Sequence, residues 1–182
     1  MIALDEQTIL RYKQFTKWTD TLRQINESVW SQPIAEGKAT VAEVISHLTN
    51  WDKHLLFTVI PAIQNGEGML FPDFDPFNKL AYDYANSGVS QNHLLEEFKQ
   101  TRHQLVEALL ADPDMAAKQV PANGEATCPY TGIPYSLLYV IHEFNAHDSH
   151  HKKQIESVLQ HMEHSDKFMP RQTQYHNKNA LR

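Results

Sequence analysis

The chain has 182 residues, of which 41% are hydrophobic and 21% charged, and its formal net charge is -6. This composition is ordinary for a globular protein and the length suits one domain with a sizeable core. A net negative chain is poorly suited to phosphate backbones, so we expect no nucleic-acid partner. No apolar run approaches the length needed to cross a bilayer, so we expect no membrane association through a spanning segment.

The cysteine content and the N-terminus bear on the compartment. Cys128 is the single cysteine, which excludes an internal disulfide and suits a reducing environment. The first ten residues, MIALDEQTIL, lack the basic-then-apolar pattern of a signal peptide. We therefore expect a cytoplasmic protein. Without an identifiable partner base, Cys128 is expected to be a small buried residue rather than a nucleophile.

Two helices are predicted in the first third of the chain. Apolar residues recur at three- and four-residue steps over 5–31, which predicts a first long helix. Pro33 and Gly37 then interrupt the pattern. The stretch Thr40-Val-Ala-Glu43 is a capping-box pattern, so a second helix should begin there and end near Pro61.

The connection over 64–89 is rich in Gly, Pro and aromatic residues, and it predicts an irregular segment with a short helix at about 76–86. Its aromatic side chains either form a wall over a functional site or pack beneath the loop; packing is slightly favoured. A third long helix is predicted over 90–111, with Ser90 as its cap. After a loop over 112–134, a fourth long helix should run to about His164.

Four long amphipathic segments without a strand pattern predict an all-α protein, a four-helix bundle with long connecting loops and a short extra helix. The predicted bundle domain covers 1–164, and a C-terminal tail follows over 165–182. The long connections after the second and third helices leave room for a crossover.

The last helix carries the clearest chemical pattern, four of the chain's eleven histidines within 141–155. At about 100° per residue, His147 and His151 lie one turn apart on the edge of the apolar stripe. Two imidazoles in this arrangement can share a metal ion if another helix supplies a third ligand. Alternatively, they are histidines at the edge of the core that bond to backbone or carboxylate groups. His142 and His150 point away from the stripe.

Three further residues have open roles. His142 and Glu143 do not form an HExxH motif with His147, because the two histidines are five residues apart. Glu143 lies one turn before His147, so it either orients that imidazole or is solvated. Asp52 falls in the apolar stripe of the second helix and either acts beside a site or pairs with a backbone or arginine group. His47 lies about 100° from the stripe centre, where a surface residue is expected.

Two stretches together resemble the DinB/YfiT-like superfamily. GKATVAEVISHLTNWD, over 37–52, resembles its second-helix signature, in which Thr or Ser begins a helix reading x-x-E-x-x-x-H-L-x-x-(W)-(D/E). HDSHHKKQI, over 147–155, resembles its last-helix motif of two histidines four residues apart followed by x-x-Gln-(Ile/Leu). The order of helices agrees over most of the chain. One departure is Lys153, which stands where the family usually has a small residue.

The resemblance implies a four-helix bundle that holds one divalent metal ion on His47, His147 and His151. Three imidazoles leave a coordination position open for water or a substrate atom, and they suit Zn, Ni or Fe about equally. The implied function is a metal-dependent enzyme acting on a small-molecule substrate, of the thiol S-transferase or hydrolase type. A low-molecular-weight thiol cosubstrate and a homodimer are also suggested. The alternative is a non-catalytic metal-binding or stress-response module.

Overall fold

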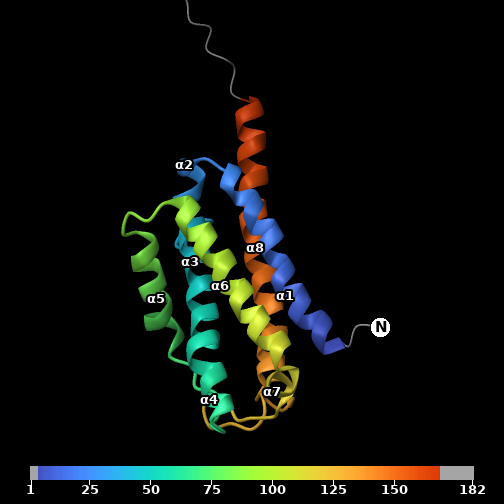
Figure 1. Cartoon of the computed structure of the whole chain (residues 1–182). Helices are drawn as coiled ribbons and strands as arrows, with labels where there is room; N and C mark the ends of the chain where they lie inside the picture. Colours follow the sequence, from blue (N-terminus) through green and yellow to red (C-terminus); the bar gives the residue numbers. More distant parts are fainter. Residues whose placement is uncertain (1–3, 169–182) are drawn as a thin grey trace, which may run out of the picture.

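The fold is a helical bundle, seen in a computed structural model that describes residues 4–168. The long helices α1, α3, α6 and α8 form the four-helix bundle that the sequence predicts (Figure 1). Within the described residues, the helical segments in chain order are α1 (Leu4–Thr21), the 3-10 turn η1 (Leu22–Gln24), α2 (Glu27–Trp30), α3 (Val41–His54), the π-helical turn η2 (Leu55–Val59), α4 (Ile60–Gln64), α5 (Phe74–Ala85), α6 (Gln91–Ala111), α7 (Pro113–Ala117) and α8 (Leu137–Phe168).

The prediction of one helix over 5–31 is wrong, because the chain breaks twice there. α1 gives way to η1, and Ile25 then adopts an extended conformation with ψ 145°. Asn26 starts α2 by accepting a hydrogen bond from the backbone N–H of Val29 at 3.0 Å. Asn is a strong N-cap residue, so this side chain competes with continuation of the first helix. The apolar period alone did not reveal the break.

The later helix boundaries follow local signals. The predicted capping box is confirmed: the Glu43 N–H donates to the Thr40 hydroxyl, and the Thr40 N–H donates to the Glu43 carboxylate. Ser90 caps α6 as predicted. Ser136 accepts from the Tyr139 N–H at the start of α8, slightly after the predicted start. α8 also continues through 165–168, and the rest of the predicted tail, 169–182, lies outside the described residues.

α5 gives the bundle its crossover. The sequence predicted a short helix at about 76–86, and α5 confirms it. Figure 1 shows α3 descending, α5 returning along its outer flank, and α6 descending again, so α3 and α6 run in the same direction. α6 packs against both α3 and α1, and α1 packs against α8. Because α5 lies against α3, two sides of α3 are covered, and most of its residues are buried.

The buried apolar side chains form two clusters, one at each end of the bundle. On α6, Phe98 belongs to one cluster and Leu105 to the other, and the fully buried Arg102 lies between them. Asp52 on α3 and Asp148 on α8 occupy the same boundary and are also buried. We call Arg102, Asp52, Asp148 and Tyr12 the charged layer. It divides the core at the level of His47 and His147.

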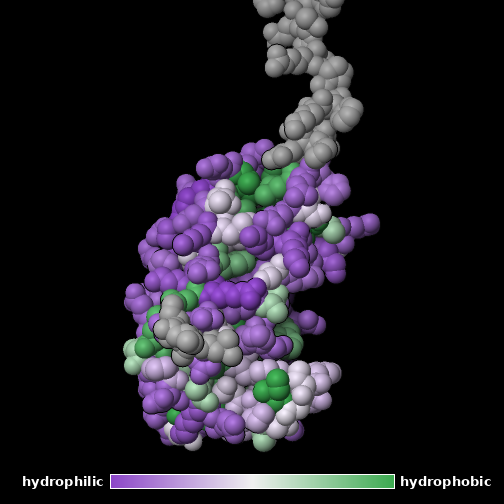
Figure 2. Space-filling view, turned by 90° about the vertical axis from the view of Figure 1, so that its right-hand side faces the viewer, coloured by the Kyte–Doolittle hydropathy of each residue, from purple (hydrophilic) through white to green (hydrophobic). Residues whose placement is uncertain are grey.

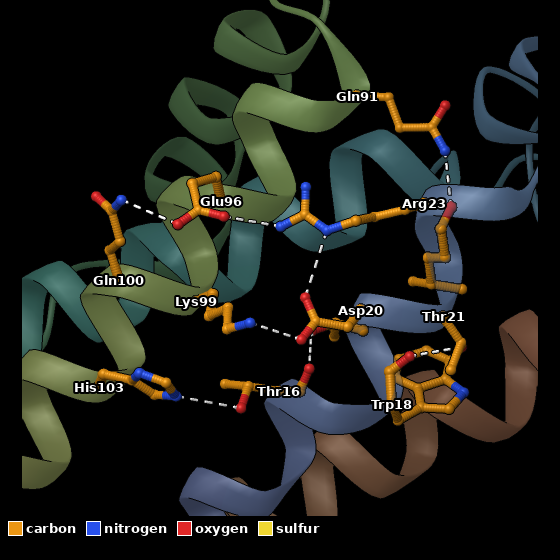
Figure 3. A network of polar contacts seen from close by, with 12 residues as sticks. Thr16, Trp18, Asp20, Thr21, Arg23, Gln91, Glu96, Lys99, Gln100 and His103 are labelled. Atoms are coloured by element: carbon orange, nitrogen blue, oxygen red, sulfur yellow. Dashed lines mark hydrogen bonds and ion pairs between the residues drawn. The ribbon is translucent and has the colours of Figure 1, made fainter.

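Polar contacts also join α1 to α6 near the surface (Figure 3). Asp20 on α1 accepts from Lys99 on α6 at 2.7 Å and from Arg23 at 3.4 Å. Arg23 continues the network to Glu96 at 2.8 Å. These groups are partly exposed, so each pair contributes little stability by itself. The contacts align two helices whose apolar stripes are already buried.

The outer face of the bundle on the α1 side is largely hydrophilic, with hydrophobic residues in small separate patches (Figure 2). This agrees with an amphipathic α1 that turns residues such as Ile9 and Tyr12 inward. None of the helices in the described range 4–168 is both long and apolar enough to cross a membrane.

Candidate metal centre

Three histidines from two helices converge beside the charged layer. His47 comes from α3, and His147 and His151 come from consecutive turns of α8. The Nε2 atom of His147 lies 3.4 Å from that of His47 and 3.1 Å from that of His151. One nitrogen from each ring lies within 4.8 Å of the other two. We call these residues the histidine triad; they are the same three that the family resemblance implied.

Hydrogen bonds at the outer nitrogens indicate how two of the rings are protonated. The Nδ1 of His47 lies 2.9 Å from the Asn78 side-chain oxygen, and the Nδ1 of His151 lies 3.1 Å from the Gln154 side-chain oxygen. An amide oxygen only accepts, so both Nδ1 atoms carry the proton. The Nε2 atoms of His47 and His151 therefore present lone pairs toward His147, as metal ligands do.

Burial keeps the triad neutral. It is the main cause that lowers the pKa of His47, His147 and His151 to about 4 each, from an ordinary value of 6.5. The neighbouring imidazoles lower the pKa values further, and the amide oxygens of Asn78 and Gln154 oppose the shift. A neutral imidazole is the form that binds a metal ion.

His47 is buried, with 6% of its surface exposed, although its place on the helical wheel favoured the surface. The reason is α5, which packs over that side of α3. The Ser46 hydroxyl donates to the Ala81 carbonyl at 2.7 Å, and the Asn50 amide donates to the Phe77 carbonyl at 3.3 Å. A single apolar stripe predicts one buried side, whereas α3 has two.

Asp52 bonds to the charged layer. Its carboxylate accepts from Arg102 Nε at 2.6 Å and from the Tyr12 hydroxyl at 2.6 Å. Arg102 also donates to Asp148 at 2.7 Å. Of the two roles left open for Asp52, the contacts correspond to pairing with arginine; no hydrogen bond joins it to a triad histidine within the described residues.

The charged layer and the triad are adjacent in sequence, because Asp148 directly follows His147. Burial raises the pKa of Asp148 to about 6 and that of Asp52 above its usual value, and Arg102 opposes both shifts. Arg102 was not identified from the sequence. The available signal was its position in the apolar stripe of α6, where a charged residue needs a buried partner.

The other candidates are not part of the triad, although the ring of His150 lies 5.9 Å from that of His151. Glu143 is exposed, and among the described contacts it has no hydrogen bond to His147. His142 and His150 are exposed, as predicted. Cys128 lies in the connection before α8, where hydrogen bonds from the Thr131 and Tyr139 hydroxyls are the main causes that lower its pKa to about 6.

Aromatic residues of the 64–89 segment gather around Trp51, one turn after His47 on α3. The ring centroid of Trp51 lies 4.5 Å from that of Phe77, 5.6 Å from that of Phe74 and 6.1 Å from that of Phe144. Phe144 in turn lies 6.2 Å from His147. Packing accounts for most of these contacts, yet the cluster borders the triad, and Phe74 remains 68% exposed.

Comparison with known proteins agrees with this architecture. The model of the DinB superfamily matches residues 12–155, a span that includes the whole triad. The chain belongs to the DinB superfamily. No curated protein matches it significantly.

One solved structure supports the DinB-like fold of the whole domain. It is the structure of YfiT from Bacillus subtilis, described as a probable metal-dependent hydrolase with an unusual four-helix bundle topology. The two chains superpose with a TM-score of 0.69 over 89% of this chain and 90% of that one, at 13% sequence identity. At this identity the likeness concerns the fold.

Two of the three ring pairs in the triad have the nitrogen separation of a metal site. In a tetrahedral site with metal–nitrogen distances of about 2.0–2.1 Å, two ligand nitrogens lie roughly 3.3 Å apart. The observed Nε2 separations of 3.4 and 3.1 Å fit this value. Within the described residues, this cluster brings together three histidines, with one nitrogen of each ring within 4.8 Å of the other two. Such a set can hold a divalent ion and leave one position for another molecule.

Proposed function

We propose that this protein is a metal-dependent enzyme that acts on a small molecule, with His47, His147 and His151 as the metal ligands. The observation that carries the proposal is the approach of three Nε2 atoms, two of them with lone pairs directed at the third. Without a cation, one proton on His147 could serve only one of the two short contacts. A divalent ion satisfies all three nitrogens together.

Hydrolysis is the reaction class we favour. A divalent ion on three neutral imidazoles supplies Lewis acidity toward a bound water, a carbonyl or a thiolate. The description of the YfiT structure as a probable metal-dependent hydrolase supports the first use. Transfer to a low-molecular-weight thiol is the second reaction that the same ligand set would serve.

The chain's own residues would perform three tasks. The triad holds the ion, and burial keeps its imidazoles unprotonated at neutral pH. Asn78 and Gln154 orient two of the rings. The aromatic cluster beside His147, through the half-buried Phe144, offers an apolar surface to a substrate held at the ion.

The first experiment is metal analysis by elemental mass spectrometry on protein purified without a polyhistidine tag. We expect about one equivalent of a divalent metal, lost in His47→Ala and in His147→Ala. His142→Ala is the matched control, because it removes an exposed histidine from the same helix. An unloaded wild-type protein, or metal retained in both triad variants, would contradict the proposal.

Activity is then tested with the loaded protein. Ester, amide and thioester substrates are offered with and without a thiol such as cysteine or glutathione. Turnover that depends on both metal and His147 supports the enzyme. A loaded protein that is inert toward all of them would favour the non-catalytic metal-binding module.

A further inference from the structure

Asn78 on α5 contacts two neighbouring residues of α3 through one atom. Its side-chain oxygen lies 2.9 Å from the Nδ1 of His47 and 3.0 Å from the Nε1 of Trp51. The indole Nε1 is only a donor. Trp51 therefore establishes that the atom between the two rings is the amide oxygen, and the His47 contact must be a bond donated by Nδ1–H.

The orientation of Asn78 has a direct effect on the ring of His47. A neutral imidazole carries its proton on one nitrogen only. Because Nδ1 donates to Asn78, Nε2 is unprotonated, and its lone pair faces His147 3.4 Å away. With the other tautomer, Nε2–H would point into the triad and block metal binding.

The surroundings fix Asn78 in turn. α5 is bonded to α3 on both sides of this contact, through Ser46 to the Ala81 carbonyl and through Asn50 to the Phe77 carbonyl. Trp51 is 4% exposed and is held by the rings of Phe74 and Phe77. The oxygen of Asn78 thus has little freedom to leave His47.

We propose that Asn78 is a positioning residue of the metal centre, which selects the metal-binding tautomer of His47 and makes α5 a functional part of the site. The proposal rests on the proposed metal site. It assigns a role to the crossover helix, whose sequence carries no metal-ligand pattern.

The test compares Zn²⁺ affinity among wild type, Asn78→Ala, Asn78→Asp and Ser46→Ala, by competition with a chromophoric chelator at neutral pH. Loss of a partner that orients a ligand typically weakens metal binding by about 10- to 100-fold, and we expect this for Asn78→Ala. Asn78→Asp keeps an acceptor at the same place and should bind Zn²⁺ much more tightly than Asn78→Ala does, close to wild type. Ser46→Ala removes another buried bond between α3 and α5 but leaves the oxygen of Asn78 on His47, so it should weaken Zn²⁺ binding much less than Asn78→Ala does.

A second readout does not need metal. Nitrogen-15 NMR of the histidine side chains in the metal-free protein should show His47 protonated at Nδ1 in wild type and Asn78→Asp. Asn78→Ala should show a mixture of tautomers or the Nε2–H form. If Asn78→Ala keeps wild-type affinity, or loses no more than Ser46→Ala does, the proposal is overturned. A wild type that binds no Zn²⁺ refutes the metal site instead, and the tautomer measurement still decides the role of Asn78.

Discussion

At the scale of single residues, the histidine triad should make the free energy of unfolding depend on pH. The pKa of each imidazole is about 4 in the folded protein and near 6.5 when unfolded. Between about pH 4 and 6.5, these imidazoles bind more protons in the unfolded chain than in the folded chain. The free energy of unfolding should therefore fall as pH is lowered from about 6.5 toward 4.

This prediction can be isolated from other titrations. Urea unfolding of the metal-free protein is measured at pH 7.5 and pH 5 for wild type, His147→Gln and the exposed-site control His142→Gln. We expect a smaller loss between the two pH values in His147→Gln than in wild type, because one suppressed imidazole is gone. The carboxylates titrate in all three proteins and cancel. Equal losses in wild type and His147→Gln would contradict the assigned pKa.

A second prediction at this scale concerns the contribution of Arg102 to stability. It is fully buried between Asp52 and Asp148, at 2.6 and 2.7 Å. Arg102→Met would leave two buried carboxyls without their cation, and removal of one partner from a buried ion pair costs about 3–5 kcal/mol. Urea unfolding measures the loss. Lys79→Ala breaks an exposed pair with Asp83 and should stay within about 0.5 kcal/mol of wild type. Similar values for both variants would refute a structural role of the charged layer.

The sequence predicted these residues to different degrees. The four-residue spacing identifies His147 and His151, because helix geometry places them on one edge. His47 was identified only through the family motif, since the wheel of α3 gives no sign of the second helix that covers it. Arg102 has a recognisable signal in the sequence, a charge within an apolar stripe. Asn78 left none, because its role depends on how α5 docks.

At the scale of elements, the start of α3 is the helix boundary that the local sequence specifies most clearly. The Thr40 hydroxyl and the Glu43 carboxylate bond reciprocally to backbone N–H groups at 3.1 and 2.7 Å. Thr40→Ala should lower the free energy of unfolding by about 1 kcal/mol, and Thr40→Ser should retain most of it. Chemical denaturation decides between them; a Thr40→Ser variant as unstable as Thr40→Ala would show that the hydroxyl is not the cause.

Helix boundaries were predictable where a side chain caps the backbone in an expected place, as Thr40 and Ser90 do. The break after α1 was missed because Asn26 acts as a cap inside an apolar pattern that continues on both sides. The direction of α6 relative to α3 could not be derived from either helix. It follows from α5, which uses the length of the 64–89 segment to return along the bundle.

At the scale of the whole molecule, the bundle should not depend on metal. Two apolar clusters and the charged layer hold the long helices together. We expect chelation to leave the far-ultraviolet circular dichroism unchanged and to lower Tm by no more than about 10 °C, consistent with the loss of a bound ligand near 100 times its Kd. If chelation unfolded the protein, the metal would be structural.

The charged layer also limits how the helices can be aligned. Sliding α8 by one turn, about 5.4 Å, would place Phe144 or Lys152 opposite Arg102 and carry Asp148 into an apolar cluster. A wholly apolar core would tolerate such a shifted register, whereas an unpaired buried charge does not. The register that pairs Arg102 with both Asp52 and Asp148 is also the one in which His47 faces His147. The charged layer thus destabilises shifted packings of α8 relative to the one that brings the three histidines together.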